Sequence, residues 1–323
     1  MSPLNKVEQL IRDEIALHGP ISFERFMEVA LYHPQHGYYC RGEKPIGVQG
    51  DFYTASQLQP AFGKLMRAYI ERLAEERRVP LPRSISEFGA GRGEMEASFA
   101  GWEYQAVEVH SPLPLAPVNG AVFGNEFFDA LPVQSAVRVD GQYHERLVAW
   151  RDSRFVWVTS PEPSAEIAAY AARFRVPPGD GFEFEVHRRG IRFLEDLLSA
   201  SASALCVFVD YGYGERDWKR FPEGTLMSYQ RHRADADVLA NAGEKDITAH
   251  VPFHALAEVA SAMGGQVLRM ELLARALMYA GERDEFLLVL DAATEREQFA
   301  RRQQLKSLLF GLGESFHVIA ISK

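Results

Sequence analysis

SISEFGAGRG, residues 84–93, ends a short apolar run with three glycines at alternate positions. Glycine has no Cβ, so it lets the backbone adopt positive φ and approach a ligand closely. Backbone amides that open a following helix would point at the same ligand. The pattern therefore predicts a strand, a ligand-binding turn at Gly89, Gly91 and Gly93, and a short helix from Glu94 to about residue 100. A strand-to-helix turn without a ligand is the alternative that this stretch leaves open.

The spacing of these glycines separates two kinds of cofactor. A dinucleotide-binding turn has the pattern G-x-G-x-x-G, but this chain has Glu94 where the last glycine would stand. From Glu87 it reads E-x-G-x-G-x-G, which resembles the first motif of class I S-adenosylmethionine (SAM) methyltransferases. The resemblance implies that SAM is the cofactor and that Glu87 and the three glycines bind it. SAM has no diphosphate, so an acidic residue beside the glycines is compatible with it.

A second strand is predicted at residues 104–109, with Glu108 near its end. In Rossmann-like folds an acidic residue at this place accepts hydrogen bonds from ribose hydroxyls, so we expect Glu108 to bind the cofactor; a surface acid is the alternative. Only 14 residues separate Gly93 from Glu108. That is too few for a helix of three turns and a return loop. The first α/β unit is therefore predicted to be trimmed.

Polar side chains follow two further apolar strands, predicted at residues 121–123 and 205–209. Asn125 and Glu126 come after the first strand, and Asp210 ends the second. In an open parallel sheet, ligands lie beyond the carboxyl ends of the strands, so these residues are candidates for a site. Asp129 follows in the same stretch, but it could simply cap a turn.

The whole set of predicted elements indicates the fold class. Strands at 85–88, 105–109, 121–123, 205–209, 266–270 and 316–321, with helices between most of them, predict an α/β protein with a doubly wound, mainly parallel sheet. Alternating polarity after residue 133, with a turn at Asp140-Gly141, predicts an antiparallel insert. We expect an N-terminal helical cap and lid segment at 1–80, a cofactor-binding core at 81–132 and 203–323, and the insert with its helices at 133–202.

Local signals predict several helix boundaries and one loop. Ser2, Ser22 and Thr294 are placed to cap three helices. The polar stretch from Arg216 to His250 carries a charge run, which favours a solvated loop.

An ordered set of segments resembles the MidA-type family of SAM-dependent methyltransferases, which is related to the mitochondrial arginine methyltransferase that assists assembly of respiratory complex I. The segments are LYHPQHGYYC at 31–40, IGVQGDFYTA at 46–55, GNEFFDALPV at 124–133, VDYGYG at 209–214, GTLMSYQRHR at 224–233, DITAHVPF at 246–253 and LGESFHVIAISK at 312–323. The resemblance implies a Rossmann-like class I fold and N-methylation of a protein arginine. The implied partner is a protein substrate, a subunit of a respiratory complex.

The implied reaction suggests roles for the candidate residues. Methyl transfer from a sulfonium is an in-line displacement that depends on alignment, and a guanidinium acceptor also needs carboxylates to hold its plane. We therefore expect Glu126 and Asp210 to be catalytic and Asn125 to contact the cofactor. Asp51 and Tyr53 would face the substrate from a lid, although their segment could instead be a loop that caps the next helix.

Two other functions are compatible with parts of this sequence. The trimmed first unit is compatible with a non-catalytic assembly or binding protein that retains the fold. A nicotinamide-dependent oxidoreductase is disfavoured by the glycine spacing.

Composition bounds the remaining properties. The chain has 323 residues, 47% of them hydrophobic and 24% charged, with a net charge of −9, which disfavours nucleic-acid binding. Cys40 and Cys206 are the two cysteines, and they show no disulfide framework or metal spacing. We find no signal-peptide pattern and no apolar run of about 18 residues. These features predict a cytoplasmic protein without a metal or a membrane insertion; they leave the oligomeric state open.

Overall fold

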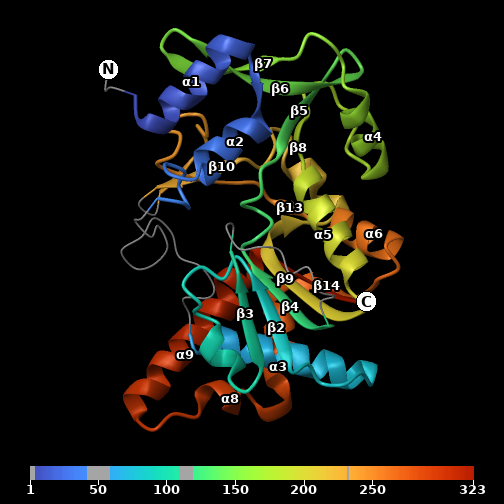
Figure 1. The fold of residues 1–323 in the computed structure, drawn as a ribbon. Coiled ribbons are helices and arrows are strands. Elements are labelled where there is room, and N and C mark those ends of the chain that lie inside the picture. Colours follow the sequence, from blue (N-terminus) through green and yellow to red (C-terminus); the bar gives the residue numbers. More distant parts are fainter. Residues whose placement is uncertain (1–3, 42–58, 109–118, 231–232) are drawn as a thin grey trace. The chain divides into compact units, whose positions relative to one another are not determined.

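Two units make up the chain in the computed structural model, which describes residues 4–41, 59–108, 119–230 and 233–323 (Figure 1). The parallel-sheet unit comprises Thr54–Phe128, Arg192–Gly212 and Ala255–Lys323. The antiparallel unit comprises Met1–Tyr53, Asp129–Ile191 and Tyr213–His254. The glycine-rich turn belongs to the parallel-sheet unit.

The sheet of the parallel-sheet unit has the strand order β14-β15-β9-β4-β2-β3. Neighbours among β3, β2, β4 and β9 pair in parallel, whereas β15 is antiparallel to both β9 and β14. The bounds are β2 Ser84–Phe88, β3 Glu103–Val107, β4 Asn119–Asn125, β9 Ser203–Tyr213, β14 Gln266–Leu272 and β15 Phe316–Ser322. This confirms the predicted α/β fold with a mainly parallel sheet. It also brings the carboxyl ends of β2, β3, β4 and β9 to one edge.

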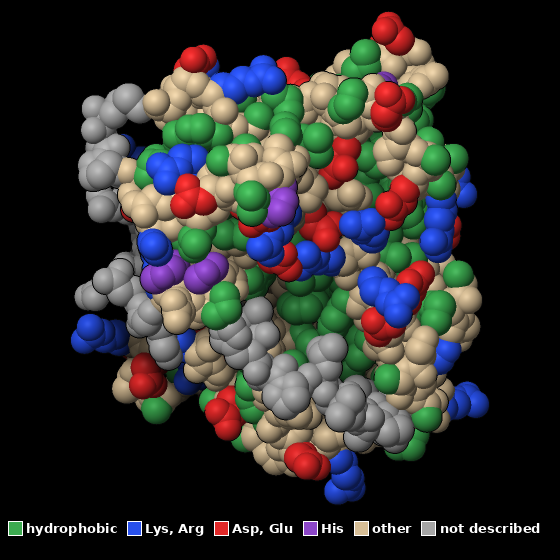
Figure 2. Space-filling view, turned by 45° about the horizontal axis from the view of Figure 1, so that its top comes forward, with side chains coloured by type: hydrophobic (Ala, Val, Ile, Leu, Met, Phe, Trp, Pro, Cys, Tyr) green, Lys and Arg blue, Asp and Glu red, His purple; other side chains and the backbone are tan. Residues whose placement is uncertain are grey.

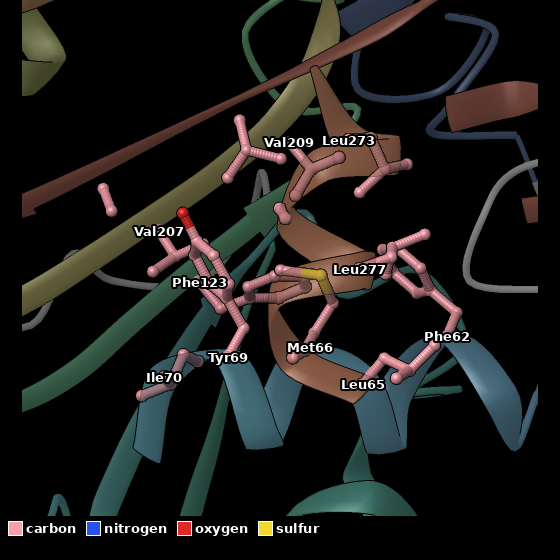
Figure 3. Packing of buried hydrophobic residues seen from close by; sticks show 14 of the residues in the cluster. Phe62, Leu65, Met66, Tyr69, Ile70, Phe123, Val207, Val209, Leu273 and Leu277 are labelled. Atoms are coloured by element: carbon pink, nitrogen blue, oxygen red, sulfur yellow. The ribbon is translucent and has the colours of Figure 1, made fainter. Parts of the chain in front are cut away.

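The core of this unit lies between the sheet and two helices, α3 (Ala61–Arg77) and α7 (Leu273–Gly281). Apolar residues of α3 recur at helical spacing, so they share the face that packs on the sheet. Figure 3 shows them meeting side chains of β4, β9 and α7; the labelled residues are Phe62, Leu65, Met66, Tyr69, Ile70, Phe123, Val207, Val209, Leu273 and Leu277. Full burial of one such side chain contributes roughly 1.5–3 kcal/mol, so this packing fixes the sheet on which the candidate site stands.

The segment between β2 and β3 contains less helix than predicted. The expected helix from Glu94 to about residue 100 is one 3₁₀ turn, Glu96–Phe99. Met95 and Phe99 are both fully buried in the core, and β3 already begins at Glu103. With so few residues available, the chain can bury these two anchors only in a tight turn, which confirms that the first α/β unit is trimmed.

Residues 133–191 of the predicted insert belong to the antiparallel unit, whereas residues 192–202 are grouped with the parallel-sheet unit. The main sheet of the antiparallel unit has the order β1-β6-β5-β8, with β7 paired to β6. Asp140 and Gly141, at φ 48° and 80°, form the predicted two-residue turn between β5 and β6. The bounds are β1 Ile21–Ser22, β5 Gln134–Val139, β6 Gln142–Arg151, β7 Arg154–Thr159 and β8 Glu183–Val186, with helices α1 Lys6–His18, α2 Phe23–Tyr32 and α4 Ala165–Arg173.

Two of the three predicted helix caps are confirmed. The Ser22 side chain accepts from the amide of Arg25 at the start of α2, and Thr294 accepts from the amide of Glu297 at the start of α9 (Glu295–Phe310). The prediction of Ser2 as the first cap is wrong, because α1 begins after Asn5. Asn5 forms a capping box in which its side chain accepts from the Glu8 amide and the Glu8 carboxylate accepts from the Asn5 amide.

The polar stretch from Arg216 to His250 is not a solvated loop. It contains a small antiparallel sheet, β11-β10-β12, formed by Met227–Gln230 (β10), Arg233–Asp235 (β11) and Asp246–Thr248 (β12). The buried Lys245 pairs with Asp235, and the buried Asp246 accepts a hydrogen bond from Tyr39. Charge in the sequence does not reveal such partners, which is why the prediction was wrong.

The remaining elements are α5 Arg188–Ala200, α6 Phe253–Ala262, α8 Leu287–Leu290 and β13 Val251–Pro252, with 3₁₀ turns at Glu215–Arg220, Glu282–Asp284 and Leu312–Glu314. Acidic and basic side chains intermingle on the face drawn in Figure 2. Some of the acidic and basic side chains form ion pairs, such as those of Arg25 with Glu14 and Glu28. Within the described ranges, every helix is too short or too polar to cross a membrane.

Candidate active site

The glycine-rich turn has the backbone that its sequence predicts. Gly89, Gly91 and Gly93 have φ of 69°, 61° and 74°, a region that strains residues with a Cβ. The amide of Gly91 donates to Oε1 of Glu108 at 2.6 Å. Two residues predicted separately as cofactor contacts are therefore in direct contact with each other, at the carboxyl ends of β2 and β3.

Glu87 is a buried residue of β2. Its side chain is only 3% exposed and accepts a hydrogen bond from the Tyr104 hydroxyl on β3. Burial raises the pKa of Glu87 to about 7; the Tyr104 hydrogen bond opposes this shift, while the charges of Glu94 and Glu108 add to it. The turn is thus surrounded by acidic groups, one of which titrates near neutral pH.

The end of β4 carries Asn125 and Glu126 in a hydrogen-bonded pair. Nδ2 of Asn125 donates to Oε1 of Glu126 at 3.0 Å. Asn125 is 8% exposed, and its Oδ1 is buried and has no hydrogen-bond partner among the residues that the structure describes. Glu126 has φ of 52°, a conformation that a non-glycine residue adopts only at a cost of about 1–2 kcal/mol. Such strain is concentrated at functional sites.

Asp210, three residues before the end of β9, holds the backbone that follows Glu126. Its Oδ2 accepts from the amides of Phe127 at 3.1 Å and Phe128 at 2.8 Å, and its Oδ1 accepts from the Tyr211 amide at 2.9 Å. The amide of Glu126 donates to the carbonyl of Val209 on the same strand. Asp210 is 1% exposed. Its carboxylate therefore fixes the turn that presents Glu126.

Sequence reasoning missed an aromatic cluster that supports both turns. The ring centroids of Phe127 and Phe193 lie 4.7 Å apart, and those of Phe88 and Phe193 lie 5.0 Å apart. Phe128 and Phe208 complete the group. Adjacent phenylalanines at 127–128, directly after a predicted strand, were the available signal.

The structure brings most of the predicted site residues to one edge of the sheet. In the register, Phe88 lies opposite Gly124, and Asn125 lies opposite Val209, so the glycine turn and the turn after β4 follow neighbouring strands. Asp129 is grouped with the antiparallel unit, and its carbonyl accepts from the amide of Ala249. Asp51 and Tyr53 lie outside the described residues. Nowhere in the described ranges do three His, Cys, Asp or Glu side chains form a group that could hold a metal ion.

The chemistry of these groups fits SAM better than a dinucleotide. Left-handed glycines leave space for a ligand at the turn, and Glu108 is an acceptor suited to ribose hydroxyls. The carboxyl groups of Glu87, Glu94 and Glu108 would disfavour a diphosphate but favour a cationic sulfonium.

Comparisons with known proteins agree with this chemistry. Residues 97–270, more than half of the chain, match a family described as "Putative S-adenosyl-L-methionine-dependent methyltransferase". The fold and the turn define a class I SAM-dependent methyltransferase. The chain belongs to that family, which confirms the MidA-type resemblance and confirms SAM as the cofactor.

Individual relatives support the same conclusion. The chain is 24% identical to "Protein arginine methyltransferase NDUFAF7 homolog, mitochondrial" of Drosophila melanogaster, over 79% of this chain and 70% of that one. It is 25% identical to the zebrafish (Danio rerio) protein of the corresponding name, over 83% and 74%. A crystal structure from Burkholderia thailandensis, bound to S-adenosylhomocysteine, matches with a TM-score of 0.87 and 29% identity, over 98% of this chain and 92% of that one.

One expectation is contradicted by these relatives. The sequence predicted a cytoplasmic protein, whereas the named animal relatives are mitochondrial proteins. The prediction rested on two unpaired cysteines and on the lack of a secretory pattern. Those features separate reducing from oxidising compartments, but they do not distinguish one reducing compartment from another.

Proposed function

We propose that the protein transfers methyl groups from SAM to a side-chain nitrogen of arginine in a protein substrate. Two relatives that align with most of this chain are named as protein arginine methyltransferases. The observation that carries the proposal is the Glu126 carboxylate, which a strained backbone and the Asn125 amide hold at the carboxyl end of β4. A carboxylate is the group that pairs best with a guanidinium.

The proposed role of Glu126 follows from the acceptor's chemistry. A guanidinium spreads its charge over three nitrogens, so the attacking nitrogen is a poor nucleophile until its charge is drawn toward the other two. A carboxylate hydrogen-bonded to the guanidinium draws charge away and fixes its plane. A fixed plane aligns the nitrogen for in-line attack, which can contribute a large part of the rate. Glu126 is the proposed catalytic residue, and Asp210 supports it by holding the amides of Phe127 and Phe128.

The cofactor would be held by the neighbouring turn. Glu87, the three glycines of the turn, Glu108 and Asn125 remain the predicted cofactor contacts. SAM supplies, when bound, a methyl group on a positively charged sulfur. Of these residues, Glu108 accepts from ribose hydroxyls in the proposal, and Gly91 keeps the backbone close to the ligand without a Cβ in the way. Asp51 and Tyr53 stay predicted substrate contacts.

The finer part of the proposal concerns the partner. We infer a subunit of a respiratory complex as the methylated protein, because the MidA-type resemblance extends over nearly the whole chain and the named animal relatives are mitochondrial. Methylation of purified respiratory subunits, followed by mass spectrometry, would identify the modified arginine. Methylation confined to unrelated proteins would contradict this partner.

Glu126→Gln is the direct test of the chemistry. This change keeps the shape of the side chain and removes its charge, so methyl transfer to an arginine peptide should fall about 100-fold or more. Binding of SAM, measured by isothermal titration, should remain within a few-fold of the parent. Glu103→Gln is a matched control, since Glu103 is exposed at the opposite end of β3, and it should leave both properties unchanged. Loss of SAM binding in Glu126→Gln would instead assign Glu126 to the cofactor.

A further inference from the structure

The side-chain oxygen of Asn125, Oδ1, is a buried hydrogen-bond acceptor that no described residue satisfies. Buried polar atoms in folded proteins nearly always have a partner, and leaving one unpaired costs free energy. An unpaired acceptor beside a catalytic carboxylate is therefore a feature that a ligand could satisfy.

The orientation of the Asn125 amide is determined by its neighbour. The Glu126 carboxylate, when ionised, only accepts hydrogen bonds, so the amide group facing it must be the Nδ2 donor. Turning the amide over would place Oδ1 against a carboxylate oxygen. The assignment of Oδ1 as the remaining atom thus follows from the hydrogen-bond network.

The ligand that fits these two side chains is a cationic donor. Asn125 contributes a neutral acceptor and Glu126 an anionic one, on consecutive residues at the end of β4. A guanidinium has five N–H donors and no acceptor, in a fixed planar arrangement. It can donate to two acceptors at once without leaving either of them unpaired.

We propose, on the basis of the arginine methyltransferase function above, that Asn125 Oδ1 accepts a hydrogen bond from the guanidinium of the acceptor arginine. This substrate contact replaces the cofactor contact predicted for Asn125 from the sequence. Nδ2 of Asn125 holds the Glu126 carboxylate in place, and its Oδ1 fixes a second edge of the guanidinium. The pair recognises the charge and the plane of the acceptor together.

The test uses the full chain, SAM and a synthetic peptide with one central arginine. Asn125→Ala should lower kcat/KM for this peptide about 10- to 100-fold, the range expected for a lost hydrogen bond to a charged group. SAM affinity by isothermal titration should change less than about threefold. The melting temperature should change little, because the loss of the Nδ2 hydrogen bond to Glu126 is offset by the removal of an unpaired buried oxygen; loss of a purely structural residue would lower it. Gln303→Ala, which alters an exposed amide on α9, is the control.

A second variant separates the two atoms of the amide. Asn125→Asp keeps an acceptor at the Oδ1 position, and a proton shared with the Glu126 carboxylate replaces the Nδ2 donor, so this variant should retain more activity toward the arginine peptide than Asn125→Ala. Equal losses in both variants would overturn the role of Oδ1, and so would a loss of SAM affinity without an effect on the peptide. If the parent protein binds SAM but methylates no arginine peptide, the proposed function itself fails. Normal activity in both variants would refute only the role of Asn125.

Discussion

The glycine turn after β2 and the Glu126 turn after β4 follow neighbouring strands of one sheet, but the sequence stabilises them by opposite means. At the glycine turn, three residues without a Cβ adopt positive φ, and a single 3₁₀ turn leads away from it. At the Glu126 turn, a residue with a full side chain adopts positive φ, and Asp210 holds the next two amides. The first turn can adjust at little cost, whereas the second is held in place.

This difference matches the two tasks of a methyltransferase. In the proposed site, glycine would give the cofactor close access to the backbone, and a short connection can order itself around a ligand. An acceptor nitrogen instead has to be aligned, which requires side chains fixed before the substrate arrives. The strain at Glu126 persists because buried hydrogen bonds and the phenylalanine cluster oppose relaxation.

Asp210→Ala should have the largest effect, because it releases the Glu126 turn. The amides of Phe127 and Phe128 would lose their acceptor, and an unpaired buried amide costs about 1–3 kcal/mol. The free energy of unfolding should fall by about 2–5 kcal/mol, and methyl transfer should fall about 100-fold or more. Urea denaturation and a methyl-transfer assay measure the two effects. Amide exchange should also become faster at Phe127 and Phe128.

Asp196→Ala is the matched control for that change. Asp196 is exposed on α5 and pairs with Arg192 one helical turn away, so its removal should change the free energy of unfolding by less than about 1 kcal/mol. If Asp210→Ala were as stable as this control and still transferred methyl groups, the turn after β4 would not depend on Asp210.

Gly91→Val should abolish tight SAM binding at the glycine turn. A β-branched side chain resists φ of 61° and would fill space next to the turn, so SAM affinity should fall about 100-fold, equivalent to about 3 kcal/mol. Gly101→Val is the matched control, because Gly101 also has positive φ, at 87°, and a Cβ there would meet no atom within 4 Å. Both variants carry backbone strain, but only Gly91→Val should lose SAM in isothermal titration. Equal affinity in the two variants would place the cofactor elsewhere.

The fold was predictable from sequence where local rules operate. Apolar strands ending in glycine or polar residues located β2, β4 and β9, and the Asp140-Gly141 turn located the hairpin of the insert. Prediction failed where long-range contacts decide the structure. Lys245 and Asp246 looked like part of a solvated loop, since Asp235 and Tyr39 become their partners only in the folded chain. The 3₁₀ turn at Glu96–Phe99 depends likewise on burial of Met95 and Phe99 in the core.

The candidate site was predictable as a set of positions but not as a network. Strand ends pointed to Asn125, Glu126 and Asp210, because parallel strands present their carboxyl ends at one edge. The sequence could not show that Asp210 accepts from three backbone amides. Nor could it show that the Nδ2 atom of Asn125 is hydrogen-bonded while its Oδ1 atom is not. Such details depend on angles within the turns, which residue types do not determine.

The smallest of these effects is the pH dependence of folding stability that comes from Glu87, beside the glycine turn. Burial raises the pKa of Glu87 from 4.5 to about 7, so between these values the folded protein keeps a proton that the unfolded chain has released. Folding stability from this group is therefore lost as pH rises from about 4.5 to 7. In Glu87→Gln the loss is absent, so the difference in free energy of unfolding between parent and variant should change by about 2–3 kcal/mol between pH 5 and 8. Tyr104→Phe sharpens the test: it removes the hydrogen bond that opposes the shift, and the transition should move to higher pH. If the free energies of unfolding of the parent and of Glu87→Gln changed in parallel between pH 5 and 8, Glu87 would be ionised throughout this range. The raised pKa of Glu87 would then be refuted.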